Sequence, residues 1–83
     1  MNVFEFQLYE ANTNRALAIG GNFCVCAAGS TLRAATYDES DTLQSGNAQS
    51  ISSGRIRFRT QESLGNVDIY GVTEYGYSFT LKN

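Results

Sequence analysis

Apolar and polar residues alternate along most of this chain with a period of two, a pattern typical of half-buried β-strands. The alternation is clearest near the N-terminus, where Phe4 and Phe6 occupy one phase and Glu5 and Gln7 the other. Apolar residues do not recur at the spacing of an amphipathic helix, and residues 62–64 form a single helical turn at most. The pattern therefore predicts an all-β protein.

The alternation, together with the turn residues between the apolar runs, predicts about seven short strands. They span residues 3–9, 15–19, 23–27, 31–37, 55–60, 67–73 and 77–81. Residues 23–27 are apolar on both faces and are therefore placed at the centre of a sheet. Residues 42–53 hold few large apolar side chains and are expected to form an exposed loop with at most one edge strand. This arrangement predicts a small antiparallel β-sandwich or barrel, a single domain over residues 1–83.

Glycine and short polar residues mark the predicted turns, because they adopt backbone conformations that other residues avoid. Residues 20–22 are predicted to form a tight turn, and residues 74–76 a hairpin-like turn. Gly71 lies inside a predicted strand and indicates a bulge or the close approach of a neighbouring backbone. The inward-facing residues of the last strand are predicted to be Tyr77, Phe79 and Leu81.

Size and charge exclude several classes of protein. The chain has 83 residues, 42% of them hydrophobic and 12% aromatic, which is too apolar for a disordered segment. Its net charge of −2 lacks the positive surplus of a general nucleic-acid binder. The longest near-apolar stretch, residues 23–28, is far shorter than the ~20 residues of a membrane helix. No export signal is visible, so we expect a protein made in a cytoplasm, with neither nucleic acid nor membrane as partner.

The sequence lacks the residue types that most catalytic and metal sites need. There is no His, which removes the serine triad and the commonest metal ligand. Cys24 and Cys26 share one face of a strand, where a disulfide would need a sharp bend, so they are expected in the core or at an interface. The carboxylates of Asp38, Glu39 and Asp41 lie together without the spacing or Gly of a calcium loop. We expect no catalytic activity, no cofactor and no metal.

Three arginines form the most distinctive pattern of the chain. Arg55, Arg57 and Arg59 alternate with apolar residues, so their guanidinium groups should line ~13 Å of one sheet face. One interpretation is ion pairing with carboxylates of a neighbouring strand, for which the candidates are Glu62, Asp68 and Glu74. The other is contact with acidic groups on a partner protein or a second copy, because Arg is enriched at interfaces. Contact with nucleic acid is a third interpretation, which the net charge disfavours.

Five tyrosines add amphipathic surface to a short chain. Tyrosine is favoured at protein interfaces, where its ring is buried and its hydroxyl stays wet. We therefore add Tyr70 and Tyr75 to the three arginines as a predicted partner interface. Tyr9 is a candidate for stacking on a sugar ring, although the chain has no Trp, the usual platform for a glycan.

Several segments between residues 34 and 79 carry a resemblance to a known class of protein. They are residues 35–38 (ATYD), Leu43, residues 54–60 (GRIRFRT), residues 67–70 (VDIY) and residues 73–77 (TEYGY). This progression resembles small virion proteins of tailed bacteriophages with a compact β-sandwich. The resemblance implies a head decoration or cement subunit, or a short module of a head or tail fibre, with a structural role and no chemistry.

Residues and resemblance together lead us to expect a non-enzymatic virion structural protein, a decoration or cement subunit that stabilises the phage head. Its partner would be the major capsid protein or another virion protein, and self-association into a homo-oligomer is compatible with its size. It would lie on the capsid surface after assembly in the host cytoplasm. The alternatives are a tail or fibre component of the virion and a small carbohydrate-binding or adhesin-like module.

Overall fold

The computed structural model describes residues 1–44 and 49–82, and within these ranges the chain is all-β. Residues 45–48, inside the predicted loop, lie outside this described part. The strands are β1 (Asn2–Gln7), β2 (Gly21–Ala27), β3 (Thr36–Tyr37), β4 (Leu43–Gln44), β5 (Gln49–Ile51), β6 (Arg55–Thr60), β7 (Val67–Thr73) and β8 (Ser78–Lys82). No helix in these ranges could cross a membrane.

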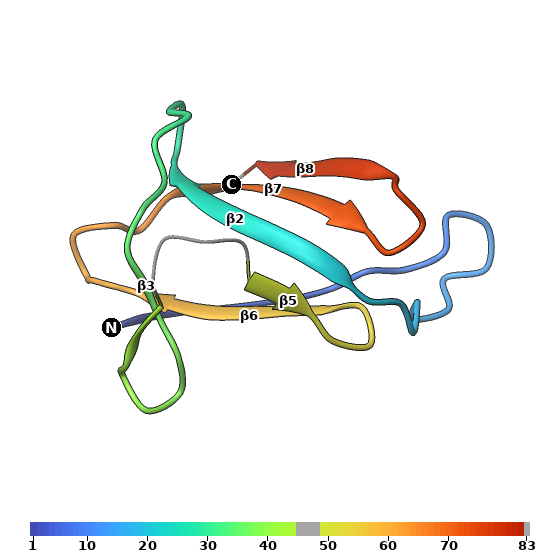
Figure 1. The fold of residues 1–83 in the computed structure, drawn as a ribbon, viewed down its shortest axis with the longest axis horizontal. Helices are drawn as coiled ribbons and strands as arrows, with labels where there is room; N and C mark the ends of the chain where they lie inside the picture. The colour runs from blue at the N-terminus through green and yellow to red at the C-terminus, as the bar shows by residue number, and fades with distance from the viewer. Residues whose placement is uncertain (45–48, 83) are drawn as a thin grey trace.

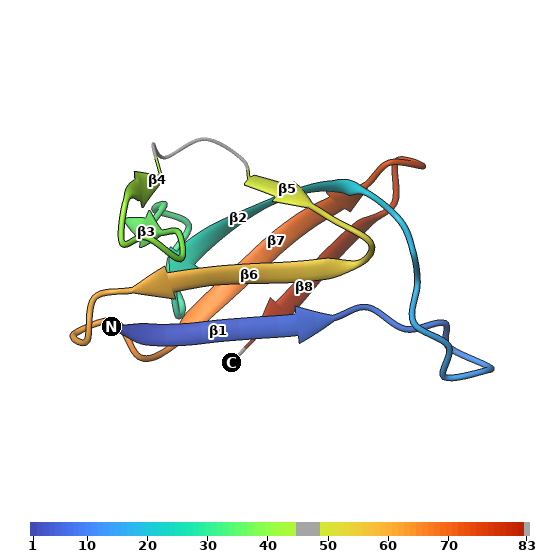
Figure 2. The same cartoon turned by 90° about the horizontal axis from the view of Figure 1, so that it is seen from below.

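The strands form two four-stranded antiparallel sheets, which pack face to face. The first sheet has the order β1-β6-β3-β4 and the second the order β5-β2-β7-β8. Figure 1 shows the two layers from the side, and Figure 2 shows that their strands cross at an angle. The predicted small antiparallel β-sandwich is therefore confirmed, and β2 occupies the predicted central position between β5 and β7.

The core lies between the sheets and is formed by one phase of the alternation in each strand. In the first sheet, Phe4 lies opposite Phe58, and their rings stack with centroids 5.0 Å apart. Phe23 of the second sheet reaches across to Phe58, with ring centroids 5.9 Å apart. Burying one such large apolar side chain contributes about 1.5–3 kcal/mol to folding. The other buried hydrophobic residues of the core are Val25, Ile51, Ile56, Val67 and Ile69.

Gly71 is required by the ring of Phe79, its cross-strand neighbour on β8. A Cβ atom at position 71 would overlap three atoms of that ring. The absence of a side chain therefore lets an edge-strand aromatic lie flat over the middle of β7. The predicted bulge or close backbone approach is wrong: the β7–β8 register is continuous, and a side chain makes the close approach.

A tight turn joins β5 of one sheet to β6 of the other. Ser53 and Gly54 both have positive φ, 52° and 73°, which is the signature of a type I′ turn. The N–H of Arg55 donates to the carbonyl of Ser52 at 2.9 Å and closes the turn. Gly54 also donates to the carbonyl of Ile19 at 2.7 Å, so the turn is fixed against the segment that links β1 to β2.

The predicted strand over residues 15–19 is wrong. Only one β-bridge, between Tyr9 and Ala16, forms in this segment. The backbone of residues 15–17 instead closes a short hairpin with the end of β1: Leu17 donates to Leu8 at 2.9 Å and Glu10 donates to Arg15 at 2.8 Å. The tight turn predicted at residues 20–22 is also wrong, because Gly21 already pairs with β5 and β7 as the first residue of β2.

Other segments also differ from the prediction. The segment expected to form an exposed loop with at most one edge strand contains both β4 and β5, and its Ile51 is buried in the core. The strand expected over residues 31–37 is reduced to β3, because Ala34 donates instead to Val25 at the side of β2, at 2.8 Å. Tyr77 does not face the core and is 73% exposed. It closes the predicted turn at residues 74–76, where Thr73 donates to its carbonyl at 2.8 Å, and it lies beyond the end of the core. Phe79 and Leu81 do pack against the core, as predicted.

Candidate functional site on the arginine face

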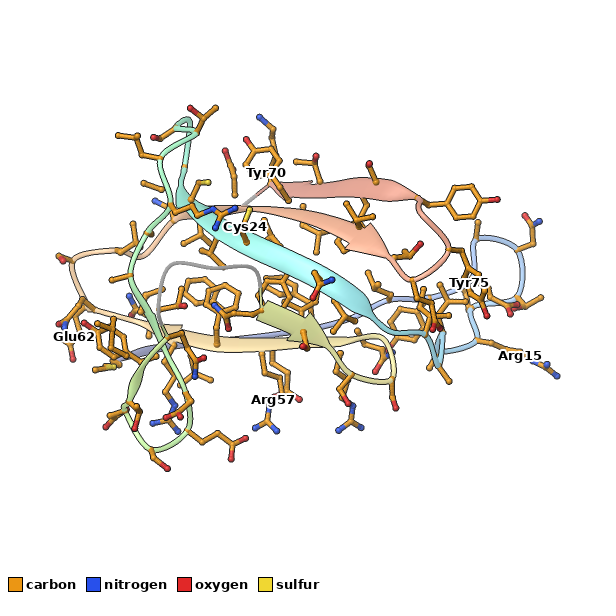
Figure 3. All side chains as sticks on the ribbon, in the orientation of Figure 1. Arg15, Cys24, Arg57, Glu62, Tyr70 and Tyr75 are labelled. Atoms are coloured by element: carbon orange, nitrogen blue, oxygen red, sulfur yellow. The ribbon has the colours of Figure 1, made fainter. Side chains whose placement is uncertain are left out.

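The three arginines project from the outer side of the first sheet, away from the core. The register of β1 with β6 places Arg55 beside Gln7, Arg57 beside Glu5 and Arg59 beside Val3. Figure 3 shows the side chain of Arg57 pointing away from the sandwich. We call this surface the arginine face and define it by Val3, Glu5, Gln7, Tyr37, Leu43, Arg55, Arg57 and Arg59. The predicted alignment of the three guanidinium groups is confirmed.

Two of these arginines form ion pairs within the chain. Arg57 Nη2 lies 2.8 Å from Glu39 Oε1, and its Nε lies 3.8 Å from Glu5 Oε2. Arg59 Nη1 lies 3.1 Å from Asp41 Oδ1. All these side chains are at least one-third exposed, and pairs of this kind contribute about 0–1 kcal/mol. The pairs therefore orient Arg57 and Arg59 more than they stabilise the fold.

The predicted carboxylate partners are wrong, because all three lie elsewhere. Asp68 is on the second sheet, where its Oδ2 accepts a hydrogen bond from Gly29 at 3.0 Å. Glu62 lies 3.6 Å from the N-terminal amine, and Glu74 accepts a bond from the N–H of Gly20 at 3.1 Å. The actual partners come from β1 and from the loop between β3 and β4.

That loop is shaped by Asp38. Its Oδ1 accepts hydrogen bonds from the N–H groups of Ser40 and Thr42, at 2.8 and 2.9 Å. A side chain that bonds its own backbone in this way fixes a compact turn. The turn brings Glu39 and Asp41 to the arginine face. One of the three clustered carboxylates is therefore engaged by backbone and the other two by arginine, and no metal-binding cluster is found among the residues described.

Arg55 differs from the other two arginines. Its cross-strand neighbour is an amide, Gln7, and no acidic group pairs with it within the described ranges. Its side chain lines two open hollows of about 630 and 620 Å³. The larger is lined by Gln7, residues 16–18, Ser50, Ser52, Ser53, Arg55 and Arg57. The smaller is lined by Glu5, Phe6, Gln7, Tyr9, Ala16 and Arg55.

This arrangement is suited to recognition. A guanidinium group presents a rigid planar fork of donors that matches a carboxylate. The hydroxyls of Ser52 and Ser53 offer further donors and acceptors beside it. The amide of Gln7 donates to the carbonyls of Leu8 and Ser53, which holds it in place next to Arg55. The hollow therefore presents hydrogen-bond donors that suit an acidic group.

The tyrosines predicted to share the interface are separated from the arginines. Tyr70 is half-buried on the outer side of the second sheet, and Tyr75 lies in the turn between β7 and β8. Figure 3 shows Tyr70 and Arg57 on opposite sides of the sandwich, with Tyr75 at one end. Tyr9, in contrast, is exposed and borders the hollow beside Arg55. A single flat partner cannot contact all five predicted interface residues at once.

Two exposed apolar residues of the arginine face were not predicted to take part. Val3 is 64% exposed beside Arg59, and Leu43 is 59% exposed beside Tyr37. Large apolar side chains on a solvent-facing sheet surface are candidates for burial by a partner. The exposure of Val3 could have been predicted from the sequence, because Val3 and the core residue Phe4 are neighbours in a strand and point to opposite faces.

Cys24 and Cys26 are free thiols on the outer side of the second sheet. Burial raises the pKa of the Cys26 thiol, and the neighbouring Cys24 and Asp68 raise it further, whereas Arg33 lowers it. Cys26 therefore stays protonated at neutral pH and is a poor nucleophile.

No family model matches this chain, and neither a curated protein nor a solved structure is significantly similar to it. Its function is therefore inferred from its own residues.

Proposed function

We propose that this chain is a non-enzymatic virion structural protein, a decoration or cement subunit that docks on the capsid of a tailed phage through its arginine face. The single observation that carries the proposal is Arg55, an arginine without an acidic partner in the described chain, beside an open hollow. A guanidinium group in this position is available to a carboxylate of another protein. The resemblance of residues 34–79 to phage virion proteins supplies the biological setting.

The apolar part of the arginine face supports docking to a protein surface. Val3 and Leu43 lie beside Arg59 and Tyr37, so apolar contact and charge-assisted hydrogen bonds would form together. A standard interface buries about 800 Å² on each partner, roughly a seventh of the 5390 Å² surface of this chain. One sheet face can provide that area.

The residue types also favour a structural role over catalysis. The chain has no His, and the buried thiol of Cys26 is held in its protonated form. Glu5, Glu39 and Asp41, the carboxylates at the arginine face, are already paired with arginines. A subunit that occupies many equivalent sites stabilises a shell even when each contact is weak.

The experiment is quantitative mass spectrometry of purified phage particles. We expect hundreds of copies of this chain per particle, because a decoration subunit repeats over the capsid lattice. Absence from the particle would overturn the proposal, and a handful of copies would favour the tail or fibre alternative.

A variant pair tests the role of the arginine face. We expect Arg55→Glu to lose occupancy on capsids that lack the native chain, because it reverses the charge beside the hollow. Arg15→Glu is the matched control, since Arg15 lies in an exposed loop beyond the arginine face. Equal occupancy of both variants would overturn the assignment of the face.

A second candidate function is glycan binding, which the smaller hollow favours. Tyr9 lies there with Glu5, Gln7 and Arg55, an exposed ring beside hydrogen-bonding side chains. We expect hits on a glycan array to disappear in Tyr9→Ala and to persist in Tyr75→Ala, whose side chain is even more exposed, at the β7–β8 turn. An array without hits would remove this candidate.

A further inference from the structure

Strand β1 is the longest uncovered sheet edge among the described residues. It comes first in its sheet and pairs only with β6. Of the other edge strands, β4 has two residues, β5 has three and β8 has five. An edge strand presents unpaired N–H and C=O groups that can add another strand.

The direction of these groups follows from the hydrogen bonding of the ladder. Leu8 donates to Gly54 at 2.9 Å, so Leu8 bonds toward the β5–β6 turn. Residues of an antiparallel strand alternate in the direction of their backbone bonds, so Phe4 and Phe6 also bond toward β6. The N–H and C=O groups of Val3, Glu5 and Gln7 therefore point away from the sheet.

The β1 edge lacks most of the features that usually prevent edge-to-edge pairing. Protected edges carry Pro, charged side chains such as Lys, a bulge or a covering loop. β1 has neither Pro nor Lys, its ladder with β6 is continuous, and Val3 is exposed on it. Its one charged residue, Glu5, lies 3.8 Å from Arg57 of the same sheet. The comparable edge strand β8 ends in Lys82, whose amine lies 4.0 Å from Asp68. The structure therefore distinguishes the two long edges.

We propose that β1 pairs antiparallel with β1 of a second copy of this chain, about a two-fold axis at Phe4. This register places Val3 of each copy opposite Glu5 of the other, and both residues point their backbone groups across the interface. About four inter-copy hydrogen bonds then form. An axis at Glu5 would place two carboxylates directly opposite each other, which is destabilising, and an axis at Val3 would leave the second half of the strand unpaired.

The side chains fit this register on both sides of the sheet. On the inner side, the Phe4 rings of the two copies meet, and they extend the stacked Phe4–Phe58 pair across the axis. On the arginine face, Glu5 has Arg57 of its own copy on one side. On its other side lies Val3 of the second copy, followed by Arg59 of that copy. The edge is therefore complementary to itself, as a two-fold interface must be.

The dimer is expected to be weak, because one strand pair buries less than the ~1,200 Å² of a stable standard interface. Sedimentation equilibrium of the isolated chain, from micromolar to millimolar concentration, is the test. We expect a monomer at the lowest concentration and a dimer that grows with concentration. A monomer over the whole range would overturn the proposal. Because the isolated chain is measured, this failure would leave capsid docking intact.

Two opposite charges at position 3 test the register. In Val3→Glu, the new carboxylate of each copy lies opposite Glu5 of the other copy, so each dimer contains two like-charge pairs. We therefore expect dimerisation about tenfold weaker. Val3→Lys faces the same carboxylates, so we expect dimerisation equal to the native chain or tighter. Val72→Glu is the control, since Val72 is exposed on the other sheet. Equal dimerisation of the two Val3 variants would overturn the register.

Hydrogen exchange gives a second readout that needs no variant. The amides of Val3, Glu5 and Gln7 should gain protection as the concentration rises. The amides of β8 that point away from β7 should not gain protection. Because backbone bonds alternate in direction along an antiparallel strand, these are the amides of Ser78, Thr80 and Lys82. Protection that appears on β8 instead of β1 would show that the wrong edge has been assigned.

Discussion

The guanidinium of Arg57 lies 2.8 Å from the carboxylate of Glu39, and this pair joins β6 to the loop between β3 and β4. Both side chains are at least half exposed. A carboxylate from a partner can therefore compete with Glu39 for Arg57, whereas Arg55, which has no acidic partner within residues 1–44 and 49–82, needs no such displacement. The arginine face thus combines one available arginine with two that are held in position by internal partners.

We expect Arg57→Ala to lower the free energy of unfolding by about 0.5 kcal/mol, because exposed ion pairs contribute little. Urea denaturation at low and high salt measures this, and high salt should shrink the difference from the native chain. Arg15→Ala is the control and should change stability less. A salt-independent loss of several kcal/mol would show that Arg57 has a packing role that its exposure does not indicate.

Gly71→Ala should destabilise the fold by about 2 kcal/mol, because the new methyl group would displace the ring of Phe79. The control is Gly65→Ala, since a Cβ at Gly65 meets no atom within 4 Å. Urea denaturation of both variants provides the comparison. Equal stability of the two variants would contradict the close contact between Gly71 and Phe79.

Ser53→Asn should stabilise the fold by about 0.5 kcal/mol, because Asn-Gly is the preferred pair for a type I′ turn. Ser53 has a φ of 52°, a conformation that Asn tolerates better than Ser. The measurement is the urea midpoint, with Ser63→Asn as the control at an exposed position of ordinary φ. A loss of stability in Ser53→Asn alone would mean that the turn has another geometry.

Stability should fall at alkaline pH through Cys26, whose pKa is raised above its ordinary value of 9.0 by burial. The folded chain holds the thiol proton more tightly than the unfolded chain does. The resulting stabilisation is complete below the ordinary pKa and is lost as the pH rises through the pKa of the folded state. Cys26→Ala should therefore show a flatter fall in stability above that ordinary value than Cys24→Ala does. An identical dependence of stability on pH in the two variants would contradict the role of Cys26.

The alternation within strands could be predicted because it depends on neighbours in sequence. Ile56 and Phe58 face the core and the arginines between them face solvent, as the period of two requires. The assignment of strands to sheets depends on contacts between distant residues, and these carry no local signal. The pairing of Arg59 with Asp41 is of this kind, because it follows from β3 lying next to β6.

Two errors have identifiable physical causes. Residues 15–19 have a strand-like composition, but their backbone bonds are divided between residues 8–10 and Gly54, so only one bridge and no ladder forms. Tyr77 has the inward phase of its strand but lies past the end of the core. One missed feature carried a usable signal, since the Ser53–Gly54 pair between two apolar runs is a hairpin motif.

The turn at Ser53 and Gly54 has a mechanical consequence. It connects one layer to the other, and Gly54 also bonds to Leu8 and to Ile19, while the next residue is Arg55. A force applied at Arg55 would therefore be transmitted through this turn to both sheets rather than to one sheet alone.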